Sequence, residues 1–352
     1  MTPPRVAITI FSAFAAFAIL EIIVRITQIL PPYGYPRGLF QKDPVLDYTM
    51  TPNFTGEIVF AEFRTTFSTN SLGIRDKEFG EKKENEYRIL ALGDSLTWGA
   101  YGVPLEQTFV KVLGKKLGSD VINAGVVGYS TDQEFAFLKI LADTYQPDMV
   151  IVNFSAGTDF EGNNQTGEMT VKNGFLVGNT FQSQTPEEVR TYLLDHLRLY
   201  PLIERGVTTL FGVHKQLLSR LQEEDRQSYL YLVPPSRDYE SQIEKTKKIL
   251  SEMKVYLLSK GITLVVTIIP TRYQLDPQNF VSNYFARGEY DMELPQKIIR
   301  EWGRQENVVV IDPLPEMQKQ QSADLYWKFN PHLTEAGHEV IGSFIFDQLE
   351  AL

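Results

Sequence analysis

Residues 88–99 read Arg88-Ile89-Leu90-Ala91-Leu92-Gly93-Asp94-Ser95-Leu96-Thr97-Trp98-Gly99, an apolar run that ends in a Gly-Asp-Ser turn. The apolar run predicts a buried strand. Ligands of open α/β sheets bind outside the carboxyl ends of the strands, so Ser95 is placed there to act as a nucleophile. The same residues also fit a strand followed by a helix N-cap, because Gly, Asp and Ser are common in turns and caps.

From residue 87 onward, strand patterns alternate with helical patterns. Runs rich in Val, Ile and Leu predict strands at 87–92, 121–123, 149–154, 263–269 and 308–311. Apolar residues at helical spacing predict helices at 106–117, 133–144, 239–259 and 335–349. Strands separated by helices imply crossover connections and a parallel sheet. The fold class is therefore α/β.

Three further blocks accompany the Ser95 turn. They read NAGVVGY at 123–129, FSAGTDF at 154–160 and FNPHLTEAGH at 329–338. Their order and spacing resemble the blocks of the GDSL-type SGNH hydrolases, which are esterases and lipases, from about residue 75 to the C-terminus. The resemblance implies a three-layer sandwich with a parallel, flavodoxin-like sheet.

A serine hydroxyl needs a base at neutral pH, and histidine has the suitable ordinary pKa. The chain has four histidines. His196 and His214 fall in predicted helices of an insertion, and His338 falls inside the last helix. His332 lies in the loop before that helix, where the resembling family carries its catalytic histidine. We therefore expect His332 to be the base for Ser95.

The family's third catalytic group is an aspartate two or three positions before this histidine. Asn330 and Phe329 occupy these positions here. An amide can orient the imidazole but supplies no negative charge. Asp324 substitutes only if its loop folds back, and a solvated turn carboxylate is the preferred interpretation. We expect a Ser95–His332 dyad with Asn330 as a weak helper.

The oxyanion hole shows a second departure from the family pattern. The resemblance assigns two donors to the backbone amides of Ser95 and Gly128. The third donor, an asparagine in the family, is Thr158 here, whose hydroxyl can donate one hydrogen bond. Asp94 and Asp159 are expected to be structural residues near the site.

Bulk properties narrow the function classes. The chain has 352 residues, 43% hydrophobic and 22% charged, which allows a full buried core. A formal charge of -10 without clustered Lys and Arg argues against nucleic acid as a partner. The absence of cysteine excludes thiol catalysis, disulfides and Cys-ligated zinc. No paired-His spacing indicates a metal, no Gly-rich phosphate loop follows a strand, and no cofactor is expected.

Residues 6–24 read VAITIFSAFAAFAILEIIV, an apolar span of about 19 residues, long enough for a membrane helix. We expect a single-pass anchor with the large domain outside the cytoplasm. A cleaved signal peptide and a buried helix are the alternatives; a signal peptide should have a shorter apolar region and a small-residue cleavage site. Glu21 either reaches the membrane interface or marks a helix–helix contact.

The domain prediction has three parts. Residues 1–30 form the anchor, 31–86 a linker and a small β-rich extension with a hairpin within 53–79, and 87–352 the hydrolase domain. An insertion at 160–236, with helices expected at 186–205 and 208–224, interrupts that domain. Insertions at the mouth of a sheet commonly form lids or substrate walls.

Two functions from different classes remain open. The first is a membrane-anchored esterase that hydrolyses or transfers an O-acyl group, with a small-molecule or glycan ester or a lipid-like ester as substrate. The segment 269–272, IPTR, resembles anchored SGNH-like proteins that acetylate exported polysaccharides. The second is a catalytically impaired glycan-binding or scaffold protein of the cell envelope, which the residues at positions 158 and 330 motivate.

Overall fold

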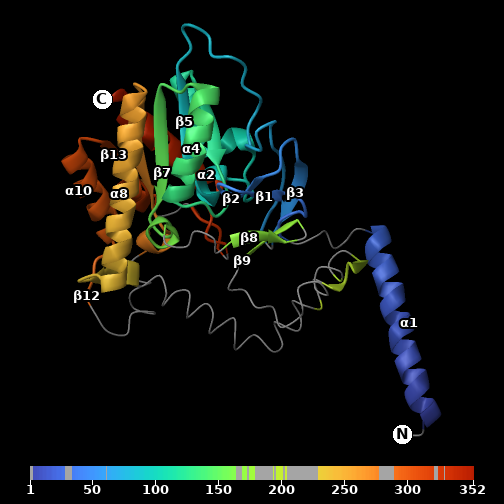
Figure 1. The fold of residues 1–352 in the computed structure, drawn as a ribbon. Coiled ribbons are helices and arrows are strands. Elements are labelled where there is room, and N and C mark those ends of the chain that lie inside the picture. The colour runs from blue at the N-terminus through green and yellow to red at the C-terminus, as the bar shows by residue number, and fades with distance from the viewer. Residues whose placement is uncertain are drawn as a thin grey trace.

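The computed structural model describes residues 3–27, 34–60, 62–163, 169–172, 174–178, 193, 196–200, 203, 229–276, 289–320, 324–328 and 330–352. The helices expected at 186–205 and 208–224 lie outside these residues, apart from a few positions of the first. In the described part, a parallel sheet lies between two layers of helices (Figure 1).

The central sheet has five strands in the order β13-β11-β7-β5-β6, and neighbouring strands are parallel throughout. The strands are β5 (Arg88–Gly93), β6 (Asp120–Gly125), β7 (Met149–Ser155), β11 (Thr263–Ile269) and β13 (Val309–Ile311). Numbered along the chain, this is the flavodoxin-like order 2-1-3-4-5, so the predicted fold class is confirmed. The strand order reverses between β5 and β7, and ligands of such sheets bind at this switch point.

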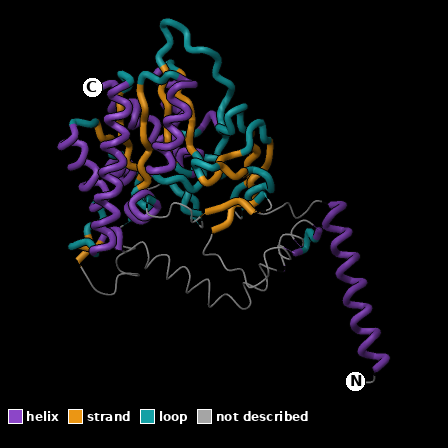
Figure 2. Tube along the Cα trace, in the orientation of Figure 1, coloured by secondary structure: helices purple, strands orange, loops and turns teal. Residues whose placement is uncertain are grey.

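Two helical layers cover the sheet. One contains α3 (Phe109–Leu117) and α12 (Glu335–Glu350), and the other contains α4 (Thr131–Tyr145), α8 (Arg237–Ser259) and α10 (Leu294–Glu306). Side chains of β5 alternate between the layers: Ile89 and Ala91 join the core under α3 and α12, whereas Leu90 and Leu92 join the core under α4 and α8. Figure 2 shows the strands enclosed between helices. Burial on both faces explains why the strand sequences are continuously apolar.

The remaining elements are short. They are α2 (Ser95–Trp98), α5 (Asp159–Gly162), α11 (Leu314–Lys319), 3₁₀ turns at Leu105–Gln107, Tyr229–Tyr231 and Arg272–Gln274, and the antiparallel pairs β8 (Met169–Lys172) with β9 (Phe175–Gly178) and β10 (Leu232–Val233) with β12 (Glu289–Tyr290). The helix expected from residue 106 begins at Phe109, because Thr108 has extended backbone and is the N-cap residue of α3.

The segment before the sheet forms two hairpins. The first pairs β1 (Phe40–Asp43) with β2 (Asp47–Met50), and the second pairs β3 (Thr55–Val59) with β4 (Arg64–Ser68). Side chains of this segment, from β4 and from the stretch between β4 and β5, hold the chain that follows Ser95. The Arg75 guanidinium donates to the carbonyls of Trp98 (2.8 Å) and Val103 (2.7 Å), and the Thr65 hydroxyl accepts from the Gly102 amide at 2.7 Å.

Helix α1 (Pro3–Thr27) projects away from the sheet domain (Figure 1). Its segment Ile8–Thr27 has 20 residues with a mean hydropathy of 2.0, which suits a membrane anchor or a signal sequence. Glu21 near its end is buried against residues of the insertion. The Glu21 carboxylate accepts from the amides of Arg198 (2.7 Å) and Leu199 (2.9 Å) and pairs with Arg25 at 2.8 Å. These bonds satisfy a carboxylate that is costly at membrane depth.

Candidate active site

The turn after β5 presents Ser95 at the carboxyl edge of the sheet. The Asp94 carboxylate caps α2 by accepting from the Leu96 amide at 2.8 Å. Burial raises the pKa of Asp94 to about 6. A Cβ atom on Gly93 would lie 2.0 Å from Thr97 Oγ1, so only glycine lets this short helix pack on the strand end. The expectation that Asp94 shapes the turn agrees with these contacts.

Ser95 and His332 meet at this edge. Ser95 Oγ lies 2.8 Å from His332 Nε2, although the two residues come from opposite ends of the domain sequence. His332 lies in the loop before α12. The Thr334 hydroxyl caps that helix, and the Trp327 amide donates to the His332 carbonyl at 3.0 Å. Both residues are half-buried.

Asn330 takes the position next to the imidazole. Its Oδ1 lies 2.5 Å from His332 Nδ1 and also accepts from the His332 amide at 3.2 Å. Because an amide oxygen only accepts, Nδ1 carries the proton and Nε2 is free to accept the Ser95 proton. Burial lowers the pKa of His332 to about 3, so the imidazole is in its base form at neutral pH. Asp324 is exposed, and its backbone carbonyl accepts from the Thr334 hydroxyl.

Two backbone amides are available to an oxyanion. The N–H groups of Ser95 and Gly128 donate no hydrogen bond within the described part of the chain. Gly128 follows β6, next to β5, and has a φ of 77°. A Cβ there would also lie 2.7 Å from the Tyr48 hydroxyl, which donates to the Val127 carbonyl at 2.8 Å. Glycine is therefore required in this turn.

Thr158 and Asp159 follow β7, across the switch point. The Thr158 hydroxyl donates to the Asp94 carboxylate at 3.3 Å, so its single proton is directed at that carboxylate. Asp159 accepts from the Ser155 amide at 2.7 Å, which ties down the loop. Burial raises the pKa of Asp159 well above its ordinary value. Thr158 as third oxyanion donor remains a prediction.

Replacing Thr158 with valine tests that donor. Valine keeps the shape and removes the hydroxyl. Since the proton of Thr158 is bonded to Asp94, we expect kcat on a 4-nitrophenyl ester to fall by less than about threefold, whereas loss of a working oxyanion donor costs about 100- to 1000-fold. A fall of that larger size would show that Thr158 turns toward the oxyanion during the reaction.

The other histidines have separate positions. His338 is buried in α12, where its Nδ1 accepts from the Phe109 amide at 3.1 Å and so holds the start of α3. Burial lowers the pKa of His338 to about 3 and keeps it neutral. The backbone carbonyl of His196 accepts from Arg25 on α1. His214 lies outside the described residues.

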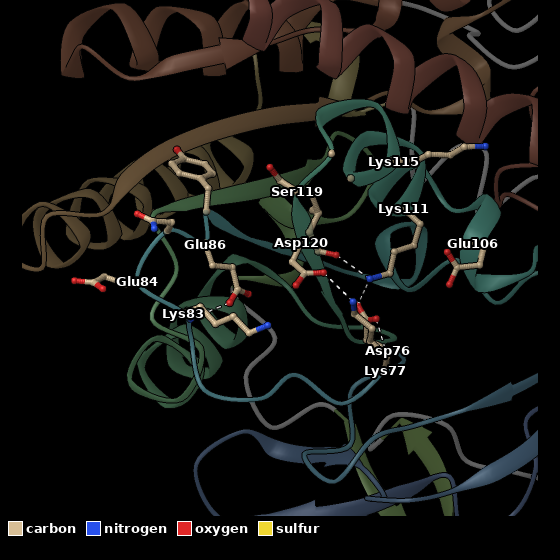
Figure 3. A pocket seen from close by; sticks show the side chains of 15 residues that line it. Asp76, Lys77, Lys83, Glu84, Glu86, Glu106, Lys111, Lys115, Ser119 and Asp120 are labelled. Carbon is tan, nitrogen blue, oxygen red and sulfur yellow. Dashed lines mark hydrogen bonds and ion pairs between the residues drawn. The ribbon is translucent and has the colours of Figure 1, made fainter.

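A cavity of about 970 Å³ lies at the opposite edge of the sheet, near the amino ends of β5 and β6 (Figure 3). Its lining mixes lysines and carboxylates, some of which pair with each other. Lys77 bonds to Asp120 at 2.8 Å, and Lys111 bonds to Asp76 at 2.5 Å. Because Ser95 lies at the carboxyl ends of the strands, the cavity is not part of the Ser95–His332 site.

Sequence reasoning missed the aromatic ring on His332. The Tyr101 ring stacks on the imidazole with a centroid separation of 3.4 Å and an angle of 12°. The Tyr101 hydroxyl is hydrogen-bonded to the Tyr35 hydroxyl, which comes from the segment after α1. The sequence shows Tyr101 six residues after Ser95, which was the available signal. Its contact with His332 depends on tertiary packing.

Solved structures resemble this chain over most of its length. A G-D-S-L family protein from Desulfitobacterium hafniense DCB-2 is 14% identical, covers 74% of this chain and 99% of its own, and has a TM-score of 0.40. A lipase/acylhydrolase from Enterococcus faecalis is 15% identical, with coverages of 75% and 96% and a TM-score of 0.41. An acetyl xylan esterase is 12% identical, with coverages of 74% and 99% and a TM-score of 0.42.

No curated protein matches the sequence. The sequence model of the GDSL-like lipase/acylhydrolase family, however, matches residues 91–340, which is more than half of the chain and includes Ser95, Gly128, Thr158 and His332. The chain therefore belongs to the GDSL-like lipase/acylhydrolase family.

Proposed function

We propose that this protein is a membrane-anchored serine esterase that hydrolyses or transfers an O-acyl group. The 2.8 Å contact between Ser95 Oγ and His332 Nε2 carries the proposal. A hydroxyl bonded to a neutral imidazole, with two backbone amides at the same sheet edge that have no acceptor in the described part of the chain, is the arrangement that acyl transfer needs.

In the proposed reaction, Ser95 Oγ attacks the acyl carbonyl while His332 Nε2 accepts the hydroxyl proton. The amides of Ser95 and Gly128 stabilise the negative oxygen of the tetrahedral intermediate. His332 then returns the proton to the leaving alcohol, and the acyl group stays on Ser95. Water attacks this acyl-enzyme in hydrolysis, and an acceptor hydroxyl attacks it in transfer. His332 deprotonates the attacking group in either case.

The proposed substrate is an ester on a carbohydrate or a lipid-like molecule outside the cytoplasm. The apolar helix α1 supports this choice, because it would hold the site at a membrane where lipids and exported glycans are found. The Glu21 carboxylate is bonded to backbone amides of the insertion. This contact supports placing the carboxyl end of α1 at the membrane surface.

Covalent trapping tests the reaction class without knowledge of the natural acyl group. The full-length protein in detergent is treated with a fluorophosphonate and analysed by peptide mass spectrometry. We expect one adduct, on Ser95, and none after unfolding in urea, because the reagent needs a serine activated by its base. A folded protein that forms no adduct would instead support the glycan-binding or scaffold alternative, for which the uncharged Asn330 is the main argument.

A further inference from the structure

The stacked ring of Tyr101 is the least expected contact of the Ser95–His332 pair. Its centroid separation of 3.4 Å and angle of 12° place one face of the phenol ring flat against the imidazole. Trp327 links the two loops that make this contact: its indole N–H donates to the Tyr101 carbonyl at 2.8 Å, and its amide donates to the His332 carbonyl at 3.0 Å. Trp327 therefore holds both of the loops that carry the stacked rings.

The N-terminal extension fixes the ring from its outer edge. The Tyr35 hydroxyl bonds to the Tyr101 hydroxyl, and the rings of Phe60 and Phe63 lie 6.1 and 6.0 Å from that of Tyr101. Burial raises the pKa of Tyr101 well above its ordinary value, and the neighbouring Ser95 hydroxyl acts in the opposite direction. Burial likewise raises the pKa of Tyr35 to about 12. Both phenols are thus neutral at physiological pH.

The positive charge of protonated His332 needs compensation, and the face of the Tyr101 ring can supply part of it. When His332 takes the Ser95 proton it becomes a cation, and the desolvation that lowers its pKa disfavours that charge. A triad aspartate would compensate it, but Asn330 supplies only an amide oxygen. The face of an aromatic ring carries negative charge density and attracts a cation lying against it, more strongly where water is excluded.

We propose that Tyr101 is a positioning residue that fixes the plane of His332 and stabilises its imidazolium through the ring face, replacing part of the work of the absent aspartate. This inference rests on the proposed esterase function of Ser95 and His332. It assigns a purpose to the N-terminal extension as well, since Tyr35, Phe60 and Phe63 hold the ring in place.

Two substitutions distinguish the effect of the Tyr101 ring from the effect of its hydroxyl. Tyr101→Leu removes the aromatic face but fills the space, and we expect the rate constant of fluorophosphonate trapping to fall roughly 3- to 30-fold. Tyr101→Phe keeps the face and removes only the hydroxyl next to Ser95, so we expect a clearly smaller loss than in Tyr101→Leu. Tyr87→Leu, at the far edge of the sheet, is the matched control and should react like wild type. Equal losses in the Leu and Phe variants would overturn the proposal.

A double-mutant cycle separates charge stabilisation from packing. In an Asn330→Asp background the carboxylate supplies the missing charge, so Tyr101→Leu should cost less there than in wild type. The same fold-loss in both backgrounds would mean that the ring only packs, and would overturn the proposal. If wild type itself is not trapped, the esterase function fails instead, so the two failures are distinguishable.

Tyr101→Leu can also fail to fold, which thermal unfolding by circular dichroism would reveal. Pentafluorophenylalanine incorporated at position 101 then decides the question, because it preserves the ring shape and reverses the charge distribution of its face. We expect this protein to be trapped more slowly than Tyr101→Phe by roughly 3- to 30-fold. Equal trapping of the two aromatic variants would overturn the proposal.

Discussion

Ser95→Ala is expected to lower kcat on 4-nitrophenyl acetate by at least about 1000-fold, to the background of the oxyanion amides alone. Alanine removes the only hydrogen-bond partner of His332 Nε2 among the described residues. No covalent acyl intermediate can then form. The measurement is initial-rate hydrolysis by the full-length protein in detergent, with thermal unfolding as a check that the variant is folded.

Ser343→Ala is the matched control for this substitution. Ser343 lies on α12 and bonds to Glu339 of the same helix at 2.9 Å, away from the carboxyl edge of the sheet. Its loss should leave kcat unchanged. If Ser95→Ala hydrolysed the ester as fast as wild type, the measured activity would not come from this site, and the esterase proposal would be wrong.

Asn330→Asp is expected to raise kcat/KM by roughly 100-fold. Asn330 Oδ1 already lies 2.5 Å from His332 Nδ1, so a carboxylate fits the same place and adds the negative charge that stabilises the imidazolium. The reverse exchange in a serine protease costs about four orders of magnitude, which sets an upper bound for the gain. Asn330→Ala, which removes the acceptor, should lower kcat/KM. An unchanged kcat/KM in both variants would show that the orientation of His332 does not limit the rate.

The same variant has a predicted pH signature. Only neutral His332 can accept the Ser95 proton, and burial lowers its pKa to about 3, so the wild-type rate should stay flat in mild acid. A carboxylate at position 330 favours the protonated ring and raises that pKa. The acid limb of kcat/KM should therefore move to higher pH in Asn330→Asp. A profile of Asn330→Asp that stays as flat as that of wild type from pH 4 to 8 would contradict this account.

Protonation of His332 should also make the stability of the protein depend on pH. Because the folded-state pKa of His332 lies below the ordinary value of 6.5, the unfolded chain takes up the proton first as pH falls. Acidification below about pH 6.5 therefore lowers the free energy of unfolding. The loss continues until the pH reaches the folded-state pKa of His332. Asn330→Asp should weaken this loss.

The parallel sheet was predictable from its strands. The expected strand at 263–269 has the same bounds as β11, and the other four differ from β5, β6, β7 and β13 by a few residues at their ends. Continuous apolar runs identify strands that are buried on both faces. Helix α10 was not predicted, because Ile298, Ile299 and Trp302 form a narrow apolar stripe between charged residues.

The site was predictable as far as its motif blocks reach. The blocks containing Ser95 and His332 predicted their meeting, and the structure places the two side chains in contact. Their catalytic roles stay predictions. The hydrogen bond from Thr158 to Asp94 was not predictable, because it depends on a side-chain rotation at the end of β7. The Tyr101 stack was missed for a related reason: it requires two loops and a hairpin to be packed together.

The bond between Tyr35 and Tyr101 also limits where the proposed reaction can take place. Tyr35 follows the end of α1 at Thr27 by only eight positions, and a chain of that length reaches at most roughly 28 Å. With α1 inserted in a bilayer, as proposed, Ser95 stays close to the lipid headgroups. Esters carried in the same bilayer would be met by lateral diffusion, and freely dissolved esters only when they approach that layer.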